Sequence, residues 1–252
     1  MHQWRDEALI LTSTRHGEQS AVVHVLTRFN GRTAGYLRSA KSPRVAPHIQ
    51  AGNCVVAAWQ ARLPDQLGYL TVEPLQALAM PLMQRAELSL VLQAVTHMLL
   101  FALPERQAFP AIFEGTRALL QTLHTNPNWA ESYVWWEVHL LAALGFGLRL
   151  DNCVQTEQQD NLTHVSPKSG HAVSKPFATP YADRLLKLPQ FLGGADSFGK
   201  QEVTVGMALT GYFLQSHIAA AMNKSLPESR QRLAALLMRD TELVIEKKQS
   251  HG

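Results

Sequence analysis

Apolar and polar positions alternate with a period of about two residues through the first part of the chain, in short segments separated by turn formers. This alternation is typical of strands that bury one face. It predicts five strands, over residues 8–12, 20–27, 32–39, 53–61 and 68–73. Asn30-Gly31 predicts a tight turn between the second and third strands. The first part of the chain is therefore predicted to be all-β.

After Pro74 and Pro81 the period changes to about 3.6 residues, which indicates amphipathic helices. The predicted helices cover residues 88–99, 112–123, 131–144, 201–222 and 228–237. Residues 148–180 interrupt this pattern with polar residues and turn formers, and they are predicted to form either a functional loop or a small β-insertion. We therefore predict two domains, residues 1–80 and residues 81–252, with the loop inserted in the second.

The predicted fold class is α+β. Five short strands can close a small barrel, and a long basic connection at residues 39–47 separates the third and fourth of them. This outline is that of an OB-fold, which binds oligonucleotides across one face and the flanking loops. The chain is thus predicted to have an N-terminal five-stranded OB-fold barrel, followed by an α-helical bundle domain with a long central loop.

Charge is distributed unevenly between the two predicted domains. Residues 1–80 carry eight Lys and Arg against five Asp and Glu, whereas residues 81–252 carry fifteen of each. A local positive field attracts phosphate groups, so the candidate DNA-binding residues are Arg15, Arg28, Arg32, Tyr36, Arg38, Lys41 and Arg44. A solvated basic face is the alternative interpretation. Tyr36 and Trp59 could each stack on bases or pack in the core.

The most apolar stretch, residues 88–103, is interrupted by polar residues and is shorter than the about 20 residues of a membrane span. No membrane association is expected. The first residues lack the arrangement of a secretion signal, so we expect a cytoplasmic protein with Cys54 and Cys153 reduced.

The segment from Gly194 to Lys200 has the glycine and lysine spacing of a phosphate-binding loop, but Gln201 stands where Ser or Thr would hold magnesium. Cys153, His164 and His171 do not have the spacing of a zinc site. No nucleophile elbow, zinc-protease helix or compact carboxylate pair is present. We therefore expect no enzyme, no catalytic residue, no cofactor and no metal.

Three stretches resemble the bacterial RecO family of recombination mediators. The first runs from Trp4 to Leu11 and continues into Arg15-His16-Gly17-Glu18. The second runs from Leu26 to Arg38. The third contains Leu144-Gly145-Phe146-Gly147-Leu148 and extends to Val165-Ser166-Pro167 and Gly170.

The resemblance implies a non-catalytic mediator of recombinational repair that binds single- and double-stranded DNA and anneals complementary strands. It also implies that the protein helps to load RecA onto DNA coated by the single-strand-binding protein SSB. The implied partners are DNA, the acidic tail of SSB, RecR and, indirectly, RecA. Arg117, Trp135 and Arg149 are candidate partner-binding residues.

Two features depart from the family pattern. Some members hold zinc through four cysteines in the central loop, where this chain has only Cys153. Many members have an arginine shortly before the glutamate that corresponds to Glu137, where this chain has Val134-Trp135-Trp136. Two alternative functions remain open: a nucleotide-dependent enzyme that uses Gly194 to Lys200, and an OB module that acts on RNA.

Overall fold

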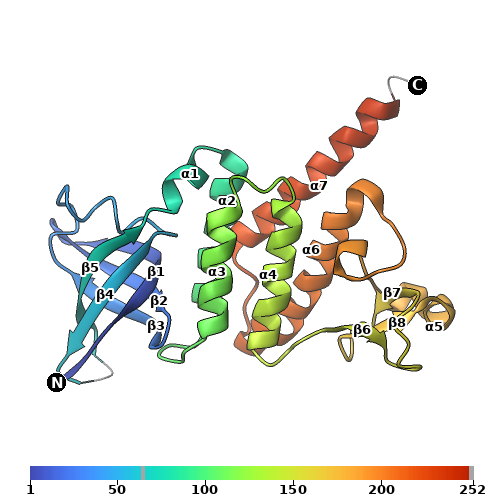
Figure 1. Cartoon of the computed structure of the whole chain (residues 1–252), viewed down its shortest axis with the longest axis horizontal. Coiled ribbons are helices and arrows are strands. Elements are labelled where there is room, and N and C mark those ends of the chain that lie inside the picture. The colour runs from blue at the N-terminus through green and yellow to red at the C-terminus, as the bar shows by residue number, and fades with distance from the viewer. Residues whose placement is uncertain (64–65, 250–252) are drawn as a thin grey trace. The chain divides into compact units, whose positions relative to one another are not determined.

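The computed structural model describes residues 1–63 and 66–249 (Figure 1). The first five strands close into a barrel with the order β1-β2-β3-β5-β4, in which only the β3–β5 pair is parallel. The strands are β1 (His2–His16), β2 (Ser20–Thr27), β3 (Gly31–Leu37), β4 (Cys54–Ala61) and β5 (Gly68–Gln76). A closed five-stranded barrel of this topology agrees with the predicted OB-fold.

Strand β1 is longer than the sequence pattern predicts, because it begins at His2 rather than at residue 8. Its first half pairs with β4, from His2 opposite Ala61 to Leu9 opposite Cys54, and its second half pairs with β2. The carboxylate of Asp6 accepts hydrogen bonds from the Phe29 backbone N–H (2.7 Å) and the Asn30 side-chain amide (2.9 Å). The polar start of the chain is therefore part of the barrel and holds the β2–β3 turn.

The inside of the barrel is filled by one residue in two from each strand, as the period of two requires. The core includes Ile10, Val23, Val25, Val55 and Leu70, each at most 2% exposed. On the outside, Leu9 and Leu26 face each other across β1 and β2 and are also buried. They are buried because helices contact this side of the barrel: α2 contacts β1 and α3 contacts β2.

The helices that follow the barrel are α1 (Ala79–Met83), α2 (Ala86–Ala102) and α3 (Pro110–Thr122). Helix α2 buries the apolar residues of the predicted stripe, among them Leu88, Val91 and Leu99. Because α2 and α3 cover part of the barrel, the first compact unit is Met1–Pro127 and the second begins at Asn128. The change from strands to helices does fall near residue 80, but a domain boundary at this position stays a prediction.

The second unit contains three longer helices, α4 (Trp129–Ala143), α6 (Glu202–Phe213) and α7 (Glu228–Gln249). Helix α4 ends at Ala143, just before the predicted stop at Gly145, whose φ of 89° few other residues adopt. The predicted helix at 201–222 is only partly α-helical. Its first residue, Gln201, belongs to the 3-10 turn η3 (Gly199–Gln201). After α6 the chain continues as the π-helical segment η4 (Leu214–Ala219) and the 3-10 turn η5 (Ala220–Met222). Within the described residues, no helix is both long and apolar enough to cross a membrane.

The predicted long central loop is largely a small sheet, so of the two interpretations of residues 148–180 the β-insertion is correct (Figure 1). Its strand order is β6-β8-β7-β9. The strands are β6 (Arg149–Cys153), β7 (Leu162–Val165), β8 (His171–Ser174) and β9 (Leu186–Lys187), with α5 (Lys175–Ala178) and the 3-10 turns η1 (Thr179–Arg184) and η2 (Gln190–Leu192) beside them. Strands of two to five residues carry too little periodicity to be recognised from the sequence.

Candidate nucleic-acid interface

The outward face of β3 and β5 carries a pair of tyrosines. Tyr36 and Tyr69 lie opposite each other in the parallel pair, and their rings meet edge to face with centroids 5.9 Å apart. The His16 ring also meets the Tyr36 ring edge to face, with centroids 5.5 Å apart. Tyr69 is 48% exposed, and the guanidinium of Arg38 lies 4.6 Å from the centre of its ring. An exposed aromatic ring next to an arginine is the arrangement on which nucleic-acid bases stack.

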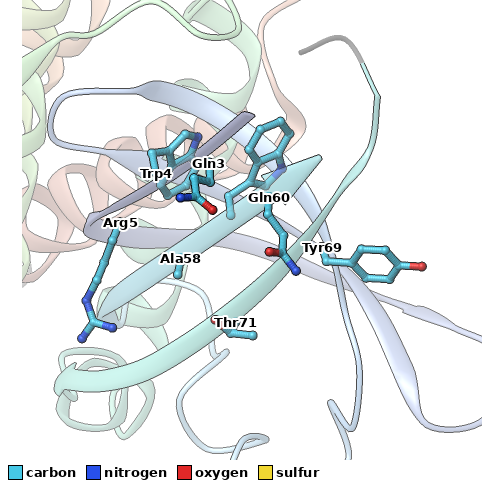
Figure 2. A pocket seen from close by; sticks show the side chains of 8 residues that line it. Gln3, Trp4, Arg5, Ala58, Gln60, Tyr69 and Thr71 are labelled. Atoms are coloured by element: carbon cyan, nitrogen blue, oxygen red, sulfur yellow. The ribbon is translucent and has the colours of Figure 1, made fainter. Parts of the chain in front are cut away.

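Two open hollows adjoin this tyrosine pair. One, of ≈ 370 Å³, is lined by Tyr36, Arg38, Val45 and Tyr69 among others, and we call it the β3–β5 hollow. The other, of ≈ 420 Å³, lies over β1, β4 and β5, and we call it the central hollow (Figure 2). Both hollows are lined by Gln60, Tyr69 and Thr71, so they are adjacent.

Figure 2 shows the Tyr69 ring projecting away from the barrel strands, with Gln60 between it and Gln3. This order follows from the register, in which Gln60 lies opposite Tyr69 on one side and opposite Gln3 on the other. Arg5 also lines the central hollow, but its guanidinium is bound by Glu73 at 3.0 and 2.7 Å. The hydrogen bonds from Arg5, and then its charge, lower the pKa of Glu73, so this pair adds no net charge.

Arg38 lines the β3–β5 hollow, and three more of the predicted DNA-binding residues are linked to it through the strand register or the connection that follows β3. We call the region of these four residues the basic end of the barrel. Arg15 is opposite Ala21, which is opposite Leu37, and Arg38 follows Leu37. The connection after Arg38 carries Lys41 and Arg44, and its Val45 lines the same hollow as Arg38. The basic-end residues are Arg15, Arg38, Lys41 and Arg44, and all four side chains are exposed. Among the described residues, none of these four forms an ion pair.

Arg28 and Arg32 differ from these four because acidic side chains neutralise them. Arg28 pairs with Glu114 at 3.0 Å. Arg32 pairs with Glu105 at 3.2 Å and donates a hydrogen bond to the Leu103 carbonyl oxygen at 2.9 Å. Its side chain is only 15% exposed. Arg28 therefore joins the barrel to α3, and Arg32 joins it to the segment that follows α2. The predicted role of both in DNA binding stays a prediction.

The three predicted partner-binding residues lie on different elements. Arg117, on α3, contacts the carboxylates of Glu7 (3.6 Å) and Glu114 (2.7 Å) within the first unit. In the second unit, Trp135 is 38% exposed on α4 and stacks on His139 at 5.9 Å. Arg149 is exposed at the start of β6. Arg117 is thus engaged in ion pairs, whereas Trp135 and Arg149 present exposed surface.

Backbone N–H groups in and near the glycine-rich segment before α6 already bind a carboxylate of the protein itself. Glu202 accepts hydrogen bonds from the backbone N–H groups of Phe198 and Gln190, both at 2.8 Å. In a phosphate-binding loop, such N–H groups point at the phosphate. The preceding strand, β9, has only two residues and does not resemble the buried strand that feeds a phosphate-binding loop. The structure therefore argues against nucleotide binding at Gly194 to Lys200.

The possible metal ligands in the second unit do not form a cluster. In the described parts of the chain, no group of three or more His, Cys, Asp or Glu side chains is placed to hold a metal ion. The Cys153 sulfur is buried and accepts a hydrogen bond from the Ser174 backbone N–H at 3.3 Å. Cys54 is buried in the first unit, and burial raises the pKa of its thiol to about 11.

Several residues of this interface were not identified from the sequence. Tyr69, Gln60 and Trp4 all line the hollows, but none of them was among the predicted binding residues. Alternation along residues 68–73 places Tyr69 on the face opposite to the apolar Leu70, so the sequence pattern could have identified Tyr69 as a residue on the outer face of the barrel. Trp4 had no such signal, because its strand was predicted to begin four residues later.

Comparison with known proteins identifies the family. The family model described as Recombination protein O N terminal matches residues 1–78, and the one described as Recombination protein O C terminal matches residues 83–227. The DNA repair protein RecO of Rhodospirillum centenum (strain ATCC 51521 / SW) is 43% identical over 232 residues, covering 91% of this chain and 92% of the relative. The protein of the same name from Cereibacter sphaeroides (strain ATCC 17029 / ATH 2.4.9) is 42% identical, covering 95% of this chain and 100% of the relative. That from Ruegeria sp. (strain TM1040) is also 42% identical, covering 94% of this chain and 98% of the relative. The chain therefore belongs to the RecO family of DNA repair proteins.

Proposed function

We propose that this protein is a non-catalytic recombination mediator that binds DNA through the basic end of its barrel. The observation that carries the proposal is the group of four exposed basic side chains at the end of the barrel, one of which, Arg38, contacts a tyrosine pair in which Tyr69 is exposed and Tyr36 is half-buried. Basic side chains bind the phosphates of any DNA sequence, and aromatic rings stack on unpaired bases. Such a surface suits a protein that holds both single and double strands without reading their sequence.

In this proposal, binding two complementary strands at the same surface favours their annealing. The protein also helps RecA to replace SSB on single-stranded DNA, together with RecR, and it works in the cytoplasm. Trp135 and Arg149 are the candidate contacts for the acidic SSB tail, because an exposed aromatic ring and an exposed positive charge complement an acidic peptide with an apolar end. We give Arg117 a smaller role, since Glu7 and Glu114 already neutralise it.

The test is a fluorescence-anisotropy titration of labelled single-stranded DNA at several salt concentrations. If the four basic-end residues each contact a phosphate, log affinity falls with log salt at a slope of about −3. Arg15→Glu/Arg38→Glu reverses two of these charges and should abolish most of the binding. The matched control is Lys168→Glu/Lys224→Glu, which makes the same change in net charge at exposed positions of the second unit.

Each outcome decides a separate point. If the control variant loses binding and the barrel variant keeps it, DNA binds the second unit and the proposed site is wrong. A slope near zero would mean that phosphates do not contribute to binding. Tighter binding to structured RNA than to single-stranded DNA would favour an OB module that acts on RNA.

A further inference from the structure

Strand β5 has an edge that no other strand of the barrel covers. On one side, β5 pairs with β4 from residue 69 to residue 76. On its other side, β3 reaches it at only two pairs, Gly35 with Gly68 and Tyr36 with Tyr69. After Tyr69 this second side has no strand partner within the described residues. We call residues 70–73 on this side the free edge of β5.

The backbone groups of Val72 point to the free edge. The Ile10 N–H donates to the Asn53 carbonyl oxygen at 2.9 Å. Hydrogen-bonded and non-bonded pairs alternate in an antiparallel ladder, so Asp6–Ala57, an even number of residues away, is also a hydrogen-bonded pair of β1 and β4. Because the backbone groups of Ala57 point to β1, its partner on β5, Val72, directs its N–H and C=O away from β4. Within the described part of the chain, neither of these Val72 groups has a hydrogen-bond partner.

Pro74 supports this orientation and limits the length of the free edge. Proline has no N–H, and in a sheet it is tolerated where the N–H would face away from a partner strand. Pro74 is opposite Val55 and lies two residues after Val72, so its missing N–H is on the same side as the free edge. Proline also prevents uncontrolled pairing at a strand edge. The free edge is therefore short, and it suits one short extended segment rather than a further sheet.

The β3–β5 hollow lies beside the free edge. It is lined by Leu70, Thr71 and Val72 of the edge and by Val45 of the connection that follows β3. Val45 and Val72 are half-buried and pack against the barrel core, so the inner side of the hollow is apolar. Extended peptides join an open strand edge through main-chain hydrogen bonds, and their alternate side chains enter pockets beside it. The free edge offers both the unpaired backbone groups and the space next to them.

The surroundings of the free edge are positively charged. Arg38 lines the hollow, and Lys41 and Arg44 lie on the connection that also lines it. The acidic residue of the free edge, Glu73, is bound by Arg5 at 2.7 Å. The positive charge of the three basic side chains is therefore not balanced by Glu73, and it complements acidic side chains.

These features discriminate between three kinds of occupant. A nucleic-acid strand does not carry the alternating N–H donors and C=O acceptors of a β-strand. A second copy of this chain would bring a second Arg38 and a second basic connection to the same edge, and like charges across a strand pair are destabilising. Successive side chains of a strand point to opposite sides, so a peptide in which acidic and apolar residues alternate matches both the basic and the apolar side of the hollow.

We propose that the free edge of β5 binds an extended segment of another protein in which acidic and apolar residues alternate. The segment adds a strand beside Val72, its apolar side chains contact Val45 and Val72, and its acidic side chains lie near Arg38. It differs from an acidic tail with an apolar end, for which Trp135 and Arg149 are the candidate contacts. The inference goes beyond the proposed function, because it does not require DNA binding.

The test measures amide hydrogen exchange of the full-length chain by NMR, with and without a synthetic peptide of about six residues, the usual length of a strand. In this probe glutamate alternates with valine. The matched probe has the same composition, with all its glutamates before its valines. An unpaired N–H at a strand edge exchanges fast, and pairing protects it. We expect the alternating probe to slow exchange at Val72 by about tenfold or more, and the matched probe to have little effect.

Two variants separate the backbone of Val72 from its side chain. Val72→Pro removes the N–H that β4 does not use, at a position equivalent to that of Pro74. It should weaken binding of the labelled alternating probe by about tenfold in fluorescence anisotropy, the upper value of one hydrogen bond. Val72→Ala also loses the branched side chain but keeps the N–H, so it should retain most of the affinity. If Val72→Pro does not fold, the exchange of the wild type decides.

Each remaining outcome overturns the inference. If the alternating probe binds and exchange at Val72 is unchanged, the peptide binds elsewhere. Equal protection by both probes would mean that alternation, and hence pairing as a strand, is not required. Protection by an oligothymidine but not by the alternating probe would make nucleic acid the occupant. Protection that rises with protein concentration alone would make it a second copy of the chain. Failure of the proposed function is measured separately, because the peptide experiment contains no DNA.

Discussion

The buried pair of Glu137 and Arg230 connects the three long helices of the second unit, and its removal can be predicted quantitatively. Glu137, on α4, is completely buried. It accepts hydrogen bonds from Arg230 of α7 (3.0 Å twice), Thr210 of α6 (2.5 Å) and Tyr133 one turn earlier on α4 (2.9 Å). The side chain of Arg230 is 7% exposed and also donates to the Met207 carbonyl oxygen at 2.8 Å. Burial opposes the charge of Arg230, but Glu137 outweighs burial and raises the pKa of the guanidinium.

The variant is Glu137→Gln, which nearly preserves shape and removes the negative charge. It leaves the Arg230 charge buried without a counter-ion, and losses from breaking a buried pair in this way are about 3–5 kcal/mol. The control is Asp196→Asn. Asp196 pairs with Lys175 at a similar distance, 3.0 Å, but their side chains are 39% and 62% exposed. An exposed pair contributes about 0–1 kcal/mol, so burial should account for the difference between the two variants.

The assay is urea unfolding followed by circular dichroism and tryptophan fluorescence. We expect a large fall in the midpoint for Glu137→Gln and almost none for Asp196→Asn. The double variant Glu137→Leu/Arg230→Met has no buried charge, so it should lose less stability than Glu137→Gln. If Glu137→Gln unfolds within about 1 kcal/mol of the wild type, the pair does not hold these helices together.

Two further predictions concern the barrel unit. Gly31 has a φ of 72°, and a Cβ there would overlap the Gln107 backbone, so Gly31→Ala should cost about 2 kcal/mol or more in thermal or urea unfolding. Gly115→Ala, on the exposed side of α3 with nothing within 4 Å, should instead stabilise by about 1 kcal/mol; equal effects would contradict the argument. Burial, and then the charge of Arg32, lower the pKa of His24, so the unfolded chain takes up its proton at a higher pH than the folded one. Stability should therefore fall as the pH drops below about 6.5, the ordinary pKa of histidine, and urea midpoints at several pH values should fall less steeply for His24→Gln.

The parts of the fold that sequence predicts well are those determined by local pattern. Strand β2 (Ser20–Thr27) has the predicted bounds, because the Asn30-Gly31 turn fixes one end and the alternation fixes the buried face. The first half of β1 could not be predicted, since its polar residues form a strand only by pairing with β4, more than fifty residues later. The short strands of the insertion depend on each other in the same way.

The candidate site shows the same division between local and distant information. The positive charge of the N-terminal part is visible in the sequence, and four of its six central basic residues lie at the basic end. The ion pairs of Arg28 and Arg32 could not be foreseen, because Glu114 and Glu105 are distant in the sequence. The pocket lined by Trp4, Asn30, Trp59 and Arg106 likewise combines residues from β1, the β2–β3 turn, β3, β4 and the segment after α2.

The closed barrel limits how any partner can be held. Every strand from β1 to β5 pairs with a neighbour on each side over part of its length, so the barrel leaves only short strand edges for an extended peptide to join by backbone hydrogen bonds. A ligand on the outward face of the barrel is therefore held mainly by side chains, one phosphate or ring at a time. Such contacts can be exchanged singly with a competing strand or protein, so a bound strand can leave in small steps without one large barrier. In the proposed function, this kind of stepwise release would let the protein pass a bound strand on to another protein.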